Sequence, residues 1–335
     1  MPALLAFAAL LFLVAAGAWI NEAISSSRDQ RRFAPPGRLL EVGGCRVHVR
    51  EQGGGSPSVV FEAGLAASSI SWSHVQELVS EFASTVAYDR PGLGWSGDCH
   101  RPLTLPGMVT HLKQILSAAA IPAPYILVGH SFGALIIRAF AHQSPRDIAG
   151  LVLVDPVSIN AWAPCSNENR SRLAYGARLS RRGAWLAKFG IVRLALTALA
   201  AGKRTFPRLI GQATSGRGNE TLKRLVGEVT KLPPHLLPAV RSHWSAAKSF
   251  QSMAAHLECL PGAAQTAAEF DLTPEIPVIV LSAGTATDAE LRERDAWTAG
   301  TTRGRHTQLP NSGHWLHLEY PEIVVGAIRE LIAPI

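Results

Sequence analysis

A serine between two glycines, at the end of an apolar run, constrains the fold of this chain most strongly. Residues 125–133 read YILVGHSFG, and a stretch rich in alanine and isoleucine follows them. The run predicts a buried strand, the G-x-S-x-G pentapeptide a sharp turn, and the next residues a helix. Gly129 and Gly133 leave room for a strained turn that lifts the hydroxyl of Ser131 clear of the sheet. We therefore predict that Ser131 is a nucleophile.

Short apolar runs alternate with helical patterns along most of the chain, which indicates an α/β domain. The runs show no polar alternation, as expected for strands that helices cover on both faces, so we predict a mostly parallel central sheet of about eight strands. Strands are expected near residues 39–42, 45–51, 58–62, 85–88, 125–128, 151–154, 278–281 and 306–309. Helices are expected near residues 73–82, 105–119, 132–142, 288–299 and 321–332.

The N-terminus predicts a membrane segment. Residues 3–20 carry no charge and, at about 1.5 Å per residue, can cross most of a bilayer core of about 30 Å. No basic residue precedes this run, and Arg28, Arg31 and Arg32 follow it, which favours an uncleaved anchor in residues 1–24 over a cleaved signal segment. The small residues at positions 15–18 are typical of a signal-peptide cleavage site, so cleavage of the N-terminal segment stays an alternative. By the positive-inside tendency the arginines would hold the bulk of the chain in the cytoplasm.

A polar linker is expected at residues 25–37, followed by a core made of residues 38–156 and 271–335. Between them, residues 157–270 lose the strand pattern and become helical and basic, with 16 Lys and Arg against 5 Asp and Glu, whereas the rest of the chain is net acidic. We predict that this segment is a helical cap. Its apolar residues line an acyl pocket or pack between cap and sheet: Trp162, Trp185, Phe189, Phe206, Leu236 and Trp244.

The basic residues of the cap fit two surroundings. Arg178, Arg181, Arg182 and Arg193 can meet anionic lipid headgroups beside the anchor, or form a solvated basic face. No recognised module interleaves aromatic with basic residues here, so we expect no nucleic-acid partner.

The four cysteines, at positions 45, 99, 165 and 259, have no C-x-x-C or Cys/His spacing, so they give no local support for a metal site. Their even number permits two disulfides. We favour buried, reduced cysteines that act as small hydrophobic residues.

A serine hydroxyl becomes a good nucleophile when a base takes its proton, so a histidine must come within hydrogen-bond reach of Ser131. His314 is the best placed of the 12 histidines, because residues 311–315, NSGHW, lie between the last predicted strand and the last predicted helix. His317, three residues later, is the second candidate. At the start of the helix after the serine, the backbone N–H of Phe132 can stabilise an oxyanion.

At this point the chain resembles the α/β-hydrolase superfamily, in its esterase- and lipase-like branch with a serine nucleophile and a hydrophobic N-terminal leader. Residues 61–65, FEAGL, look like the turn after the third strand, and the resemblance implies that Leu65 supplies the second oxyanion N–H. Residues 88–96, YDRPGLGWS, are similar to the segment after the fourth strand of many members. We interpret Asp89 and Arg90 as a salt-bridged turn beside the site.

The acid that orients the histidine has two candidates. Many members of the superfamily show Gly-x-x-Asp after the strand that corresponds to residues 277–281, but here Asp288 comes one position late. Asp155 follows the strand after the serine turn, where some lipases and dehalogenase relatives place their acid, at the edge where sites gather in open α/β sheets. We favour Asp155 and keep Asp288 as the alternative acid.

The resemblance implies a serine hydrolase that cleaves carboxylic esters with an apolar acyl group through an acyl-enzyme, without cofactor or metal. A serine at position 131 argues against epoxide hydrolases and haloalkane dehalogenases of this superfamily, which use an aspartate as nucleophile. An amidase or aminopeptidase, a cofactor-free perhydrolase and a hydroxynitrile lyase share the triad. An alternative outside the enzymes is a non-catalytic scaffold with the same fold.

Overall fold

The computed structural model describes residues 1–99, 102–200 and 231–333. Contacts divide the chain into two compact units: Met1–Ala34 with Arg178–Gln251, and Pro35–Ala177 with Ser252–Ile335. We call them the anchor unit and the hydrolase unit. This division differs from the predicted one, because it groups the N-terminal segment with part of the predicted cap and leaves residues 157–177 and 252–270 with the predicted core.

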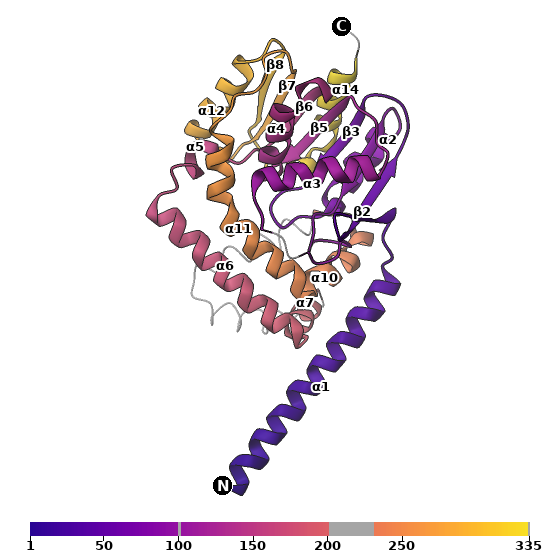
Figure 1. Cartoon of the computed structure of the whole chain (residues 1–335), viewed down its shortest axis with the longest axis vertical. Helices are drawn as coiled ribbons and strands as arrows, with labels where there is room; N and C mark the ends of the chain where they lie inside the picture. Colours follow the sequence, from indigo (N-terminus) through magenta and orange to yellow (C-terminus); the bar gives the residue numbers. More distant parts are fainter. Residues whose placement is uncertain (100–101, 201–230, 334–335) are drawn as a thin grey trace. The chain divides into compact units, whose positions relative to one another are not determined.

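The hydrolase unit is built on an eight-stranded sheet in the order β1-β2-β4-β3-β5-β6-β7-β8 (Figure 1). β1 pairs antiparallel with β2, and β2 with β4, whereas all other neighbours are parallel. The sequence prediction of a mostly parallel sheet of about eight strands is confirmed. The strands are β1 Arg38–Val42, β2 Cys45–Gln52, β3 Ser58–Glu62, β4 Ser84–Tyr88, β5 Tyr125–His130, β6 Ile148–Val154, β7 Val278–Ala283 and β8 Gly304–Leu309.

Helices cover both faces of this sheet, and the buried side chains form one cluster on each face. On one face pack α3 (Leu105–Ala118) and α4 (Gly133–Gln143), and on the other α2 (Ser73–Ser80) and α14 (Pro321–Ile332). Every residue of β5 is buried, as the unbroken apolar run 125–128 predicts for a strand covered on both sides. The other described helices of this unit are α5 Ile159–Trp162, α12 Asp288–Ala299 and α13 Leu316–Glu319, with parts of α6 Asn167–Lys188 and α11 Ala247–Ala267.

The anchor unit contains α1 (Pro2–Arg32), α7 (Ile191–Ala200) and α10 (Leu237–Ser245). Among the described residues α1 is the one helix long and apolar enough to cross a membrane, with a mean hydropathy of 2.5 in its most apolar window and none of that window buried. Such a helix fits a membrane anchor and a signal sequence alike. It continues to Arg32, so most of the residues predicted as a polar linker are helical.

A disulfide joins Cys45, at the start of β2, to Cys99, with their Cα atoms 5.7 Å apart. Cys165 and Cys259 are free. The favoured interpretation of four reduced cysteines is therefore wrong for the first pair, because two cysteines 54 positions apart give no spacing signal that would place them together.

Candidate active site

Ser131 occupies a strained turn between β5 and α4. Its φ is +51°, in the left-handed region that side chains other than glycine rarely adopt. Gly133 makes the turn possible, because a Cβ there would lie 2.6 Å from the carbonyl oxygen of Glu62. The Ser131 N–H donates to the carbonyl of Val154 at 3.0 Å, which ties the turn to the end of β6. The chain thus presents a half-buried serine at the carboxyl edge of the sheet.

Asp155 comes directly after β6 and contacts His314. Its Oδ2 lies 2.5 Å from His314 Nδ1, and its Oδ1 accepts hydrogen bonds from the Ala283 N–H (3.0 Å) and from Arg294 Nη1 (2.9 Å). Asp155 is only 6% exposed. Burial alone raises the pKa of Asp155, but the hydrogen bond and charge of His314, with the charge of Arg294, bring it below its ordinary value. The group is therefore a buried carboxylate directed at the imidazole.

Asp288, the alternative acid, has a different place. It is the first residue of α12, after the N-cap Thr287, whose side chain forms a capping box with Glu290. A carboxylate in the first turn of a helix is stabilised by the helix dipole. The structure thus puts Asp288 at a helix start, and brings Asp155 to His314.

The two candidate oxyanion groups belong to two different turns, the one after β3 and the one at the start of α4. Leu65 belongs to the turn after β3, where the Ala67 N–H donates to Gly64 O at 3.2 Å. Phe132 is the N-cap residue of α4, and the first N–H groups of a helix have no acceptor within that helix, so α4 itself does not occupy the Phe132 N–H. Both are positions at which a backbone N–H can be left for a ligand.

A buried ion pair holds the loop that contains Leu65. Glu62, the last residue of β3, is 1% exposed, and it accepts hydrogen bonds from the Tyr88 hydroxyl and from Arg90 Nη1. Burial raises the pKa of Glu62, and the charge of Arg90 and the Tyr88 hydrogen bond oppose that rise.

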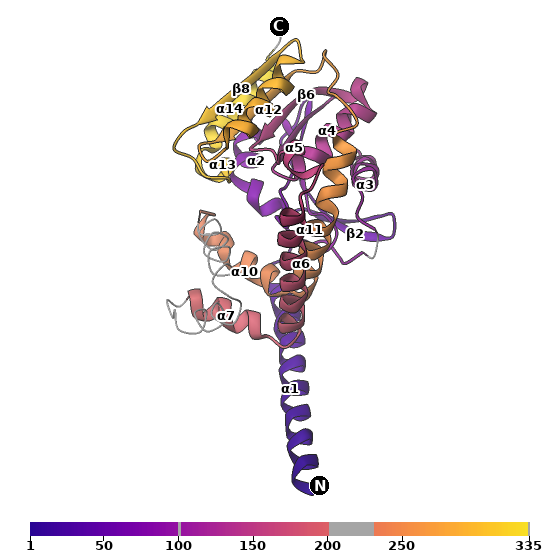
Figure 2. The same cartoon turned by 90° about the vertical axis from the view of Figure 1, so that its left-hand side faces the viewer.

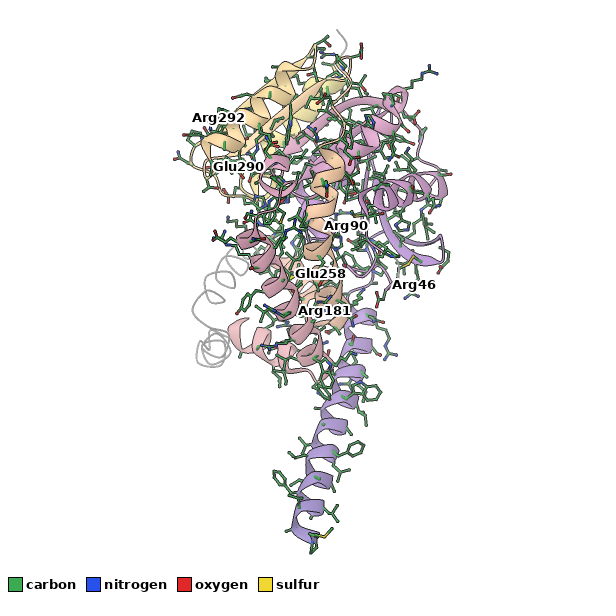
Figure 3. All side chains as sticks on the ribbon, turned by 60° about the vertical axis from the view of Figure 1, so that its left-hand side comes forward. Arg46, Arg90, Arg181, Glu258, Glu290 and Arg292 are labelled. Atoms are coloured by element: carbon green, nitrogen blue, oxygen red, sulfur yellow. A yellow bond between two sulfur atoms is a disulfide. The ribbon has the colours of Figure 1, made fainter. Side chains whose placement is uncertain are left out.

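Arg90 extends this network to the loop backbone and to α11. It donates to the carbonyls of Ala63 (2.6 Å) and Gly64 (2.5 Å), and its Nε donates to His256 Nε2 at 3.1 Å. Figure 3 shows the labelled Arg90 beside α11, the helix that carries His256. Burial and the charge of Arg90 lower the pKa of His256 to about 3, so this imidazole is neutral and accepts the hydrogen bond.

Asp89 and Arg90, which the sequence suggested as a salt-bridged turn, are both buried, but their partners are different. Asp89 Oδ2 lies 2.9 Å from His48 Nδ1, and its carboxylate accepts the backbone N–H groups of Ser69 (2.7 Å) and Trp95 (2.9 Å). Asp89 therefore closes the turn after β4, whereas Arg90 points toward the loop after β3.

A known protein family matches most of this chain. The family model described as "Alpha/beta hydrolase family" matches residues 59–327, which include the serine turn, Asp155 and His314. The chain belongs to this family.

The curated relatives of this α/β-hydrolase match it in part. The uncharacterized protein YqjL of Bacillus subtilis is 36% identical over 120 residues, 36% of this chain and 47% of the relative. The putative carbamate hydrolase RutD of Klebsiella pneumoniae is 33% identical over 136 residues, 39% of this chain and 49% of the relative. The chain spans less than half the length of these two relatives.

Solved structures share the fold of this α/β-hydrolase. An esterase from Thermogutta terrifontis superposes with a TM-score of 0.62 at 19% identity, covering 88% of this chain and 97% of the esterase. The epoxide hydrolase CorEH superposes with a TM-score of 0.66 at 18% identity, covering 89% of this chain and 98% of that protein. Neighbours with such different chemistry show the fold alone.

Three histidine rings of this α/β-hydrolase pack together, and one of them belongs to the residue before Ser131. His130 Nε2 donates to the backbone carbonyl of His314 at 2.9 Å, and the centroid of its ring lies 4.6 Å from that of His314 and 4.5 Å from that of His317. Burial, and then the charge of His314, lower the pKa of His130 to about 3. His317, the second candidate base, is fully buried against Trp72, which keeps it from acting at the surface of the site.

Sequence reasoning missed Arg294, Glu62 and His256, which surround the site but lie in unrelated parts of the sequence. Within the described ranges, no group of three His, Cys, Asp or Glu side chains is arranged to hold a metal ion.

The candidate acyl-pocket residues are dispersed. Trp185 is 66% exposed, so it does not line a closed pocket within the anchor unit. Trp162 packs against the core of the hydrolase unit. Phe189, Leu236 and Trp244 are partly buried, and Phe206 lies outside the described residues.

Proposed function

We propose that this α/β-hydrolase cleaves carboxylic esters through a covalent acyl-enzyme on Ser131. The contact of 2.5 Å between Asp155 Oδ2 and His314 Nδ1, at the sheet edge that carries the strained serine, supports this function best. An imidazole held by a carboxylate at Nδ1 has its Nε2 left to exchange a proton with a serine hydroxyl.

In the proposed reaction, Ser131 Oγ attacks the ester carbonyl carbon while His314 Nε2 takes the hydroxyl proton. The carbonyl oxygen becomes an oxyanion that accepts hydrogen bonds from the N–H groups of Leu65 and Phe132, each worth about 10²–10³ in rate. His314 then gives the proton to the departing alcohol. Water, deprotonated by the same imidazole, attacks the acyl-enzyme and releases the acid.

The nucleophile separates this proposal from the chemistry of some fold neighbours. Epoxide hydrolases and haloalkane dehalogenases of this superfamily form their intermediate on an aspartate, and position 131 is a serine. Amidases and aminopeptidases use the same triad, so p-nitroanilides must be compared with esters. The proposed substrate is a small ester with an apolar acyl group.

Labelling of the full chain in detergent with a fluorophosphonate probe, next to Ser131→Ala, tests the mechanism. We expect labelling and hydrolysis of p-nitrophenyl esters of graded chain length, both lost in the variant. A well-folded native protein that neither reacts with the probe nor hydrolyses any ester would sink the proposal and favour a non-catalytic scaffold.

The proposed location is a membrane, with α1 as an uncleaved anchor. The Cys45–Cys99 disulfide favours a hydrolase unit on the oxidising side, because disulfides form and persist outside the reducing cytoplasm. This is opposite to the side that Arg28, Arg31 and Arg32 predict. The disulfide is the stronger indication of orientation, since only three basic residues support the other side.

A further inference from the structure

The apolar part of α1 ends at a defined point. Residues 3–20 carry no charge, Trp19 and Ile20 are more than half exposed, and Asn21 and Glu22 follow. Tryptophan is enriched where a helix leaves the hydrocarbon core. If α1 spans a bilayer, the boundary of the core therefore lies close to Asn21.

Glu22 is the one buried residue described on α1, although it is charged. Both of its carboxylate oxygens accept hydrogen bonds from Arg193 of α7, at 2.7 Å each, and a third nitrogen of Arg193 pairs with Asp29. These hydrogen bonds raise the pKa of Arg193 above its ordinary value. The bidentate pair fixes α7 to the first turns of α1 beyond its apolar run.

The turn before α7 packs against the same carboxylate. Gly190 has a φ of +73°, and a Cβ there would lie 3.1 Å from Glu22 Oε2. At about 1.5 Å per helical residue, Glu22 is about 3 Å and Asp29 about 13 Å beyond Ile20. Arg193, which bridges Glu22 and Asp29, therefore lies within the headgroup layer of any bilayer that α1 crosses.

Large apolar side chains are exposed next to this ion pair. Leu194, adjacent to Arg193, is 63% exposed, and Trp185, in the last turn of α6 and five residues before Gly190, is 66% exposed. Figure 2 shows α7 following the lower end of α6. We define the interfacial face as these exposed residues and their exposed neighbours on the same segment: Arg178, Arg182, Trp185, Leu186, Lys188 and Leu194.

The interfacial face combines a tryptophan and leucines with cations. Arg178, Arg182 and Trp185 share one side of α6, because residues spaced by four and three positions lie above one another on a helix. Apolar side chains that enter the acyl boundary, with basic side chains that meet phosphate groups, characterise helices that lie in a membrane interface.

We propose that the interfacial face docks on an anionic lipid bilayer, the same bilayer that α1 crosses. Two observations identify the bilayer as the partner of the interfacial face. The ion pair of Arg193 with Glu22 holds this face at the level of the headgroups, and the ionic side chains of the face are all cationic. The anchor unit then rests on the membrane at two places, α1 within it and the interfacial face upon it. The docking concerns the anchor unit, and only the activity measured on a vesicle-embedded ester below rests on the proposed function.

Lipid contact at position 194 tests the docking independently of catalysis. The full chain, carrying Cys259→Ala, receives Leu194→Cys or, as a matched control, Gln251→Cys at an exposed position of α11 outside the interfacial face. Each thiol is labelled with a polarity-sensitive fluorophore. The proteins are reconstituted into vesicles of phosphatidylcholine, or of equimolar phosphatidylcholine and phosphatidylglycerol, that contain a doxyl-labelled quencher lipid.

We expect several-fold stronger quenching at position 194 than at position 251 in the anionic vesicles, and a reduced difference when Arg182→Gln and Lys188→Gln are combined. Equal quenching at the two positions in both kinds of vesicle would overturn the proposal. Leu194→Glu and Leu194→Phe then separate docking from chemistry. Both should hydrolyse a soluble short-chain ester at the native rate, whereas Leu194→Glu alone should lose several-fold activity on a vesicle-embedded ester.

If the native chain does not hydrolyse the soluble ester at all, the proposed function is contradicted, but the quenching result still tests the docking.

Discussion

Arg294 Nη1 lies 2.9 Å from Asp155 Oδ1, the carboxylate oxygen that His314 does not contact. The guanidinium is 2% exposed and also donates to Ser282 Oγ (2.8 Å) and to the carbonyl of Pro156 (2.6 Å). A fixed positive charge therefore faces the proposed triad acid from α12. It competes with the imidazolium for the charge of the carboxylate, and it holds that carboxylate in one orientation.

Arg294→Met should move the acidic limb of the pH profile of kcat/KM to higher pH, because the guanidinium is one of the charges that act on Asp155. Without the guanidinium, the carboxylate stabilises the protonated, inactive imidazole more strongly, so activity is lost at a higher pH as the solution is acidified. Arg294→Lys retains the charge and should shift the limb less. Superimposable profiles for the Met variant and the native protein would show that Arg294 has only a structural role.

The Met variant should also lose about 3–5 kcal/mol of stability, because it leaves a buried carboxylate with one partner fewer.

Asp155→Asn should lower kcat by about 10⁴-fold, the effect of an amide in place of the acid in serine proteases. The amide no longer holds the imidazole in the tautomer that accepts the serine proton. Asp288→Asn, the matched control on α12, should leave kcat close to the native value. Steady-state ester hydrolysis measures both, and the opposite pattern would assign the acid to Asp288.

Glu62→Gln should lower the free energy of unfolding by about 3–5 kcal/mol, because the variant leaves Arg90 buried and charged without its carboxylate. The control is Glu51→Gln, which breaks the pair of Glu51 with Arg38, whose side chains are 34% and 49% exposed. An exposed pair contributes about 1 kcal/mol or less. Urea unfolding compares the two, and a similar small loss for both would mean that the buried network contributes no more than a surface pair.

The fold was predictable because each strand carries its own signal. The unbroken apolar runs at β5 and β6 indicate strands covered on both faces, and the turn at Ser131 fixes which strand precedes which helix. His314 could be located because it lies on the loop between the last strand and the last helix. These are local patterns, each readable within about ten residues.

The surroundings of the site could not be predicted in the same way. Arg294 is 139 positions from Asp155, and His256 is 166 positions from Arg90. Nothing within α12 or α11 marks these side chains as buried, since an isolated arginine or histidine on a helix is usually solvated. Only the packing of the sheet brings them to the site, and the Cys45–Cys99 pair was missed for the same reason.

His317→Phe should make the stability of the protein less sensitive to acid. Burial keeps the pKa of His317 well below its ordinary value of 6.5, so the folded state stays unprotonated where the unfolded state binds a proton. Stability therefore rises with pH up to about 6.5 and levels off above it, with a slope of about 1.4 kcal/mol per pH unit for each such histidine. Between about pH 4 and 6, the free energy of unfolding of the variant should therefore rise less steeply with pH, by the slope that one such histidine contributes.

Urea unfolding at a series of pH values measures this slope. His74→Phe, at an exposed position, is the matched control and should leave the slope unchanged. An unaltered slope in His317→Phe would mean that His317 binds a proton in the folded protein as readily as in the unfolded chain.

Combined Cys45→Ser and Cys99→Ser substitutions should lower the free energy of unfolding by about 2–5 kcal/mol, since the disulfide closes a long loop in the unfolded chain. Dithiothreitol should destabilise the native protein similarly and leave the double variant unaffected. Cys165→Ala, which alters a buried free thiol, should retain the sensitivity to reductant.

The same pair reports the side of the membrane: in cells treated with a maleimide before lysis and reduction, Cys45 and Cys99 should escape alkylation. Modification of both in the unreduced protein would place the hydrolase unit in a reducing compartment, on the side that the arginines after α1 predict.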